Sequence, residues 1–171
     1  MLLHNLNLLG LDDFDVIVLS HQHWDHIGGL NSIISGASLV FVPETFSAEL
    51  KRDIARKVEL IEVGNPIKIG DGIYTTGVLN SGVPEQSLLV ETGKGVVVVT
   101  GCSHPGLDVI LARAKKFGEV YGVIGGFHNF RKIEILKNLK FVAPCHCTVL
   151  KDKILKMPNS RKCYAGCVFN I

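Results

Sequence analysis

One six-residue segment constrains this chain more than any other, and it reads His21-Gln22-His23-Trp24-Asp25-His26. Three imidazoles and one carboxylate in this segment are side chains that bind a borderline cation such as zinc at neutral pH. An apolar run at 15–20 precedes the segment and two glycines follow it at 28–29. This context predicts a buried strand that ends in a ligand-bearing loop. The segment therefore predicts a metal site.

The spacing of the four side chains indicates which of them bind the same ion. If the backbone is extended through His21 and His23, both rings point to the same side and can hold one ion. Asp25 and His26 follow after the chain turns, so we expect them to hold a second ion. Paired ions about 3.5–4 Å apart are typical of hydrolytic sites. We therefore expect two divalent metal ions, with zinc as first choice and manganese, iron or magnesium as alternatives.

Three more apolar runs, at 96–100, 120–124 and 141–143, lead into loops that contain His104, His128 and His146. Six of the seven histidines thus follow predicted strands, and only His4, in a predicted helix, does not. Ligand sites in α/β sheets lie at the carboxyl ends of strands. His128 can equally be a ligand, a proton donor or a histidine that bonds a neighbouring loop. The predicted metal ligands are His21, His23, Asp25, His26, His104 and His146.

The cysteines indicate the redox compartment of the protein, and one of them, Cys102, is a possible metal ligand. An odd number, five, argues against a secreted disulfide framework and favours a reducing cytosol, so we expect a cytoplasmic protein. Cys102 lies two residues from His104 and could bridge two zinc ions, but a small buried cysteine explains it better. Cys163 and Cys167 would lie about 13 Å apart on an extended strand, which excludes a disulfide in that conformation.

Length and composition indicate an ordinary globular protein with one domain, residues 1–171. The hydrophobic fraction is 47% and the net charge is +2. This charge, with no basic run, gives no sign of nucleic-acid binding. The apolar runs are too short to span a bilayer, and no signal peptide is recognisable at the start. We therefore expect neither a nucleic-acid nor a membrane partner.

Helical and extended patterns alternate along the chain and predict an α/β fold. Helices are expected at 2–9, 29–35, 47–57, 105–117, 131–139 and 149–156. Strands are expected at 15–19, 38–42, 58–63, 66–69, 73–78, 87–91, 96–100, 120–124, 141–143 and 163–171. Glycine-containing turns at 71–72 and 93–95 predict two hairpins.

The motif at 21–26, followed by two glycines, resembles the signature of the metallo-β-lactamase superfamily. Residues 100–106, 124–128 and 144–148 are similar to a branch that includes the ribofuranosylaminobenzene phosphate synthase-like proteins of methanopterin biosynthesis and proteins called metal-dependent hydrolases. The resemblance covers nearly all of the chain. It implies a metallo-β-lactamase-like αββα sandwich with a two-metal site at one edge.

This sequence departs from the family pattern at the site. Relatives usually carry a bridging aspartate after a glycine, and here Gly101 is followed by Cys102. They also usually place a metal-binding histidine before the strand that begins here near Glu85, where this sequence has none. The resemblance therefore makes His104 the substitute for that ligand.

A further departure concerns the start of the chain. Relatives have two or three strands ahead of the helix that corresponds to residues 2–9, so we expect this chain to lack them, as a short form or a fragment. Their absence would leave an open sheet edge and uncovered apolar surface, which favour contacts with other chains. We therefore expect a homo-oligomer formed through residues 1–20 and 38–42.

The leading functional hypothesis is a metallo-hydrolase whose dinuclear site activates water against an ester-type or phosphoester substrate. Asp25 would bind one metal and orient the nucleophile, and His128 would act as general acid. Positive charge at Arg131 and Lys132, near a helix start, could attract a small anionic substrate, although a solvated helix face explains it as well.

Two alternatives stay open. The resemblance also implies a condensing enzyme of methanopterin biosynthesis, which joins an aminobenzoate to phosphoribosyl pyrophosphate. A catalytically weak metal-binding subunit or fragment is the third hypothesis, because lost supporting residues can lower metal affinity or activity about 10- to 100-fold.

Overall fold

The computed structural model describes residues 2–11 and 13–171 and divides into two compact units, Met1–Gly64 and Asn65–Ile171. Each unit contains one β-sheet and its own hydrophobic core. The prediction that residues 1–171 form a single domain stays a prediction. No helix in the described part of the chain has the length and apolar character needed to cross a membrane.

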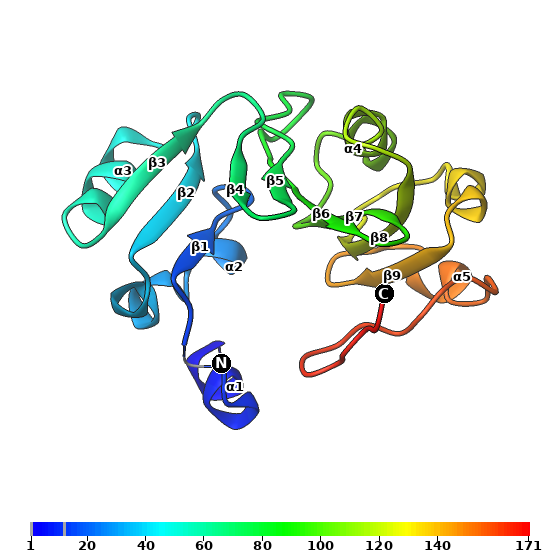
Figure 1. Ribbon diagram of the computed structural model, residues 1–171, viewed down its shortest axis with the longest axis horizontal. Helices are drawn as coiled ribbons and strands as arrows, with labels where there is room; N and C mark the ends of the chain where they lie inside the picture. Colours follow the sequence, from blue (N-terminus) through cyan, green and yellow to red (C-terminus); the bar gives the residue numbers. More distant parts are fainter. Residues whose placement is uncertain (1, 12) are drawn as a thin grey trace. The chain divides into compact units, whose positions relative to one another are not determined.

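The unit Met1–Gly64 is built on a three-stranded parallel sheet in the order β1-β2-β3 (Figure 1). β1 therefore lies at one edge of this sheet. Short helices and two 3₁₀ turns connect the strands. The elements are α1 (Leu2–Leu9), β1 (Val16–Val18), α2 (Trp24–Ile27), η1 (Leu30–Ser32), η2 (Ile34–Gly36), β2 (Leu39–Pro43), α3 (Ala48–Ala55) and β3 (Glu59–Val63).

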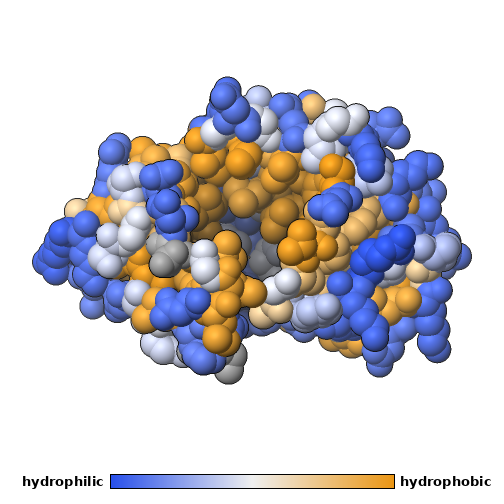
Figure 2. Space-filling model, turned by 60° about the horizontal axis from the view of Figure 1, so that its bottom comes forward, coloured by the Kyte–Doolittle hydropathy of each residue, from blue (hydrophilic) through white to orange (hydrophobic). Residues whose placement is uncertain are grey.

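The core of this unit lies around β2, whose apolar run is buried. Val40 and Val42 are fully buried and belong to the same core cluster as Ile54 of α3. α3 begins where the Ser47 hydroxyl accepts a hydrogen bond from the Leu50 backbone N–H, as helix N-caps do. By contrast, α1 has no buried residue, and Leu8 is 72% exposed. Figure 2 shows apolar residues on one face of the molecule beside hydrophilic ones.

The unit Asn65–Ile171 contains a six-stranded mixed sheet in the order β4-β5-β6-β7-β8-β9 (Figure 1). The first four strands are antiparallel neighbours, and β7, β8 and β9 are parallel. The elements are β4 (Lys68–Gly70), β5 (Ile73–Thr75), β6 (Leu88–Thr92), β7 (Gly95–Thr100), α4 (Leu107–Ala114), β8 (Val120–Gly126), η3 (Ile133–Asn138), β9 (Phe141–Cys145) and α5 (Lys151–Ile154).

The core of the second unit forms where α4 packs on the valine-rich strands. Leu107 and Ile110 of α4 are fully buried in the same cluster as Val98 of β7 and Val123 of β8. Each such side chain contributes about 1.5–3 kcal/mol by leaving water. Both predicted hairpins are confirmed, with Gly72 and Gly95 at positive φ. The core fixes β7, β8 and β9, and hence the loops that follow them.

The structure corrects several expected elements. The helix expected at 29–35 is two 3₁₀ turns, and the one expected at 131–139 is the 3₁₀ helix η3. A short helix, α2, stands where a loop was expected. The strand expected at 163–171 is wrong, because a turn joins Tyr164 to Cys167 and Gly166 has φ +85°. That conformation interrupts an extended chain.

Candidate metal centre

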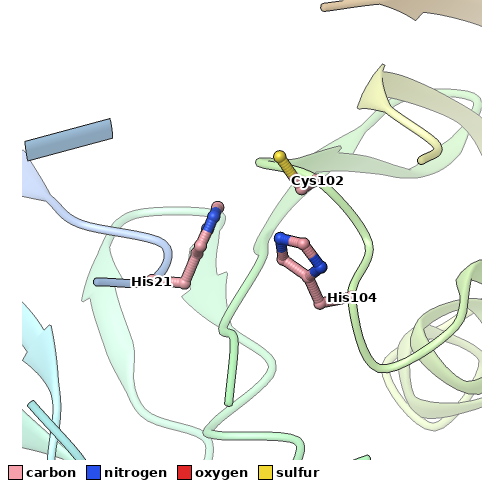
Figure 3. A group of neighbouring side chains, drawn as sticks. All are labelled: His21, Cys102 and His104. Carbon is pink, nitrogen blue, oxygen red and sulfur yellow. The ribbon is translucent and has the colours of Figure 1, made fainter. Parts of the chain in front are cut away.

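The histidine-rich segment follows β1 in the first unit, as its sequence predicts. His21 (Figure 3) is buried, and its Nδ1 lies 3.0 Å from the Ser20 hydroxyl. His23 has an extended backbone, φ −99° and ψ 147°, and is the N-cap of α2. The ring centroids of His21 and His23 lie 4.7 Å apart. The extended backbone expected at His23 is thus confirmed, and the two rings are neighbours.

Asp25 and His26 lie on α2, after the chain has turned. The His26 ring centroid lies 4.2 Å from that of His21, and His26 Nε2 lies 3.7 Å from Asp25 Oδ2. Gln22, between the histidines, points elsewhere: its side-chain amide exchanges two hydrogen bonds with Ser47 at the start of α3. This contact ties the loop to the rest of its unit.

In the second unit, three parallel strands end side by side. Thr100 of β7 pairs with Gly125 of β8, and Gly126 pairs with Cys145 of β9. The loops that follow these strands carry His104, His128 and His146. The carboxyl ends of parallel strands meet at one edge of a sheet, which is where ligand sites form in α/β proteins. β1 belongs to the other sheet, so the four strands with histidines do not share one sheet.

A buried carboxylate organises the loop after β7. Glu85 is 1% exposed, and its Oε1 accepts hydrogen bonds from the Thr100 hydroxyl and from the backbone N–H groups of residues 101, 102 and 103. Its Oε2 accepts a fifth hydrogen bond, from the His104 N–H at 2.9 Å. Hydrogen bonds to a charged acceptor are about twice as strong as neutral ones. Glu85 therefore fixes the backbone that presents Cys102 and His104.

Cys102 lies between two of the predicted ligands of its unit. Its Sγ is within 4.8 Å of a ring nitrogen of His104 and within the same distance of one of His146. Cys102 is 3% exposed, and Figure 3 shows it on the same loop as His104. A thiol beside two imidazoles is a suitable donor for zinc. Cys102 thus joins the candidate ligands, although its sequence favoured a packing role.

Three loops of the second unit are joined by hydrogen bonds. The Ser103 hydroxyl donates to the Gly126 carbonyl at 2.7 Å. The Phe127 N–H donates to the Thr148 hydroxyl at 2.9 Å, and the Val149 N–H donates to the His128 carbonyl at 3.0 Å. The loops after β7, β8 and β9 therefore hold one another in place.

The same three loops contain the described non-glycine residues with positive φ. These residues are Ser103 at +60°, His128 at +42° and His146 at +46°. This conformation is unfavourable for residues with a Cβ and is concentrated at functional sites. One strained residue after each parallel strand supports a functional role for this edge.

His128 is exposed, and its ring centroid lies 4.8 Å from that of His104. Its position is consistent with proton transfer at the edge of the site. His146 is also exposed, and His4 is exposed on α1, as expected. The roles predicted for these side chains stay predictions.

The later cysteines lie closer together than an extended strand would place them. The Sγ atoms of Cys163 and Cys167 are 3.9 Å apart, because the chain turns between them. The described cysteines are all free thiols. Burial, and then the neighbouring thiol of Cys145, raise the pKa of the Cys163 thiol to about 12. Cys163 is therefore a poor nucleophile at neutral pH.

The sequence prediction missed Glu85 as a site residue. Its partners lie 15 to 19 positions away, and no local pattern signals a buried carboxylate that accepts backbone hydrogen bonds. The structure brings together His21, His23 and His26 in one unit, and Cys102, His104 and His146 in the other. The assignment of ligands from both units to one centre stays a prediction.

Comparisons with known proteins agree with the resemblance seen in the sequence. The family model described as "Beta-lactamase superfamily domain" matches residues 2–126. A 7,8-dihydropterin-6-methyl-4-(beta-D-ribofuranosyl)-aminobenzene-5'-phosphate synthase of Methanocaldococcus jannaschii is 30% identical over 218 aligned positions, which cover 91% of this chain and 74% of the synthase. A UPF0173 metal-dependent hydrolase of Aeropyrum pernix is 27% identical over 78% of this chain and 64% of its own length.

A solved structure is similar over almost the whole chain. It is described as a metal-dependent hydrolase of the beta-lactamase superfamily, with a TM-score of 0.78 and 26% identity. The similarity covers 99% of this chain and 84% of the other. It confirms the α/β fold class expected from the sequence. The chain therefore belongs to the beta-lactamase superfamily and has a metallo-β-lactamase fold.

Proposed function

We propose that this protein is a metal-dependent hydrolase with a dinuclear centre. The observation that carries the proposal is that imidazoles gather at strand ends, three after β1 and one after each of β7, β8 and β9. The similarity to metal-dependent hydrolases supports it at a coarse level. The proposed ligands are His21, His23, Asp25, His26, His104 and His146, and the thiol of Cys102 is a further candidate.

The donor set fits a borderline divalent cation. Imidazole nitrogens with one carboxylate suit zinc, manganese or iron, and the nearby thiol of Cys102 favours zinc over magnesium. A bound metal pair supplies Lewis-acid activation of water and of a substrate oxygen.

The protein's own residues hold and move the reactants. Asp25, exposed and beside His26, orients the attacking water. His128, exposed and next to His104, donates a proton to the leaving group. Glu85 keeps the His104 backbone in place by accepting its N–H. The substrate that this arrangement suits is a small anionic ester or phosphoester.

The first prediction tests the metal ligands. Replacing His23 with alanine should remove most of the bound metal, because His23 is one of the clustered imidazoles. The matched control is His4→Ala, which removes an exposed imidazole on α1 and should leave the metal content unchanged. Elemental analysis of both purified variants and the parent protein measures the difference.

Equal metal retention in the two variants would contradict the ligand assignment. A parent protein without bound metal after supplementation with zinc, manganese or iron would contradict the metal-dependent hydrolase itself. A panel of phosphodiester, thioester and carboxylic ester substrates then identifies the bond that is cleaved.

A second candidate function is condensation of an aminobenzoate with phosphoribosyl pyrophosphate. The 30% identity to the Methanocaldococcus jannaschii synthase supports a condensing enzyme only at a coarse level, because the product named for that synthase also contains a dihydropterin-6-methyl group, which these two reactants do not supply. Release of pyrophosphate and carbon dioxide from these two reactants would establish it. Hydrolysis of the ester panel without that release would establish the first function.

We also propose that the protein self-associates through its first unit. β1 pairs only with β2 among the described strands, and Leu8 of α1 is exposed. Open edges and apolar patches favour contacts between chains. Light scattering at micromolar concentration should give a mass above one chain, and Leu8→Lys should lower it. A monomeric mass for the parent protein would contradict this prediction.

A further inference from the structure

The second unit contains a pocket beside two histidines of the candidate centre. Its volume is about 350 Å³, and His104 and His128 lie in its lining. Pockets for small molecules have volumes of roughly 300–1,000 Å³ and mostly apolar walls. Phe130 is the partly exposed apolar side chain of its lining, whereas Leu107 and Phe127, at 0% and 1% exposure, belong to the buried core. A small molecule in this pocket would therefore contact the Phe130 ring and lie close to His104.

Two cations line the same pocket, but one of them is already paired. Lys132 Nζ lies 2.6 Å from Asp108 Oδ2 in the first turn of α4. The hydrogen bond from Lys132 lowers the pKa of Asp108, so that this carboxylate stays charged down to acidic pH. The charge of Lys132 is therefore compensated over the whole neutral range.

Arg131, the adjacent residue, is in a different position. It is exposed and lines the pocket, and within residues 2–11 and 13–171 it has no acidic partner in a salt bridge. A guanidinium presents a rigid fork of donors that matches the oxygens of a carboxylate or phosphate. The pocket thus combines one partly exposed aromatic ring, one uncompensated cation and a histidine of the candidate centre.

We propose that this pocket binds the anionic group of the substrate and that Arg131 determines this specificity. The substrate class is a small apolar or aromatic molecule that carries a phosphate or a carboxylate. The inference rests on the proposed function, because His104 belongs both to the pocket and to the proposed metal ligands. Arg131 positions the substrate, and the residues of the candidate metal centre carry out the reaction.

Phenyl phosphate and benzoate are the probes that test this inference, with phenol as their uncharged counterpart. Their dissociation constants are measured by NMR titration of the full chain, with and without a chelator. In the chelated protein, Arg131→Ala should weaken both anionic probes about 10- to 100-fold, the effect of losing a charged hydrogen-bonding group. Phenol binding should stay unchanged, and Arg131→Lys should restore part of the affinity.

Lys137→Ala is the matched control. It removes one positive charge from η3, but Lys137 pairs with Glu134 and does not line the pocket. It should change the affinity for either anionic probe less than threefold. Equal weakening by Arg131→Ala and Lys137→Ala would overturn the proposal, because the effect would then be one of net charge.

The two proposals fail separately. If His23→Ala loses its metal while Arg131→Ala still binds both anionic probes normally, only the anion pocket is wrong. If the anionic probes depend on Arg131 while His23→Ala keeps its metal, only the ligand assignment is wrong. Preference for one probe decides between a phosphate and a carboxylate substrate.

Discussion

Replacing Glu85 with alanine is expected to destabilise the protein by at least about 3 kcal/mol, because five hydrogen-bond donors lose one buried charged acceptor. Four of the donors are the consecutive backbone N–H groups of residues 101 to 104. The free energy of unfolding, from urea denaturation, measures the loss. Bound metal should fall as well, since the loop that carries His104 loses its support.

The variant Glu85→Gln tests whether Glu85 supports His104 specifically or only stabilises the whole protein. The amide can keep Oε1 as an acceptor, but it places an NH₂ donor opposite the His104 N–H, so the disturbance should be greatest at that residue. Metal affinity should therefore fall more than stability does. Glu91→Ala is the control, because Glu91 is exposed on the neighbouring strand β6. A Glu85→Ala protein as stable as Glu91→Ala would contradict the role assigned to Glu85.

A similarly large effect is expected for Gly125→Ala in β8. A Cβ at this position would overlap the Thr100 carbonyl oxygen and lie 2.8 Å from Thr100 Cγ2, and φ is +135°. The clash involves the backbone of β7, which cannot rotate away as a side chain could. We expect a loss of at least about 3 kcal/mol in the free energy of unfolding.

Gly70→Ala provides the comparison within the same sheet. Gly70 also lies in a strand, but an added Cβ would meet no heavy atom within 4 Å. Its effect on the free energy of unfolding should stay within about 0.5 kcal/mol. Similar denaturation midpoints for the two variants would show that β7 and β8 are not packed as closely as described.

The sequence predicts most of the fold because its strongest patterns are local. The valine run of β7 and the amphipathic pattern of α3 lead to elements close to those expected. The errors occur where the local pattern is weak. Residues 131–139 are apolar enough for a helix yet form 3₁₀ turns, and Gly166 ends the extended chain expected at 163–171.

The candidate site is predictable in part for the same reason. Histidines after apolar strands reveal the loops, and the register of β7, β8 and β9 confirms that three of these loops share one edge. Two contributions depend on contacts between distant residues and leave no local pattern. Glu85 reaches the loop at 101–104 from before β6, and the thiol of Cys102 lies near ring nitrogens of both His104 and His146, which come from two different loops.

The hydrogen bonds between the three loops make their motion collective. The Thr148 hydroxyl accepts a hydrogen bond from the Phe127 N–H and donates one to the Cys145 carbonyl. If the loop after β8 opened, the buried Thr148 hydroxyl of the loop after β9 would lose its donor. Ser103 links the loop after β7 to Gly126 in the same manner. Segments coupled like this open as one cooperative unit and not one at a time. On heating, the three loops should therefore unfold locally in a single step, before or together with global unfolding.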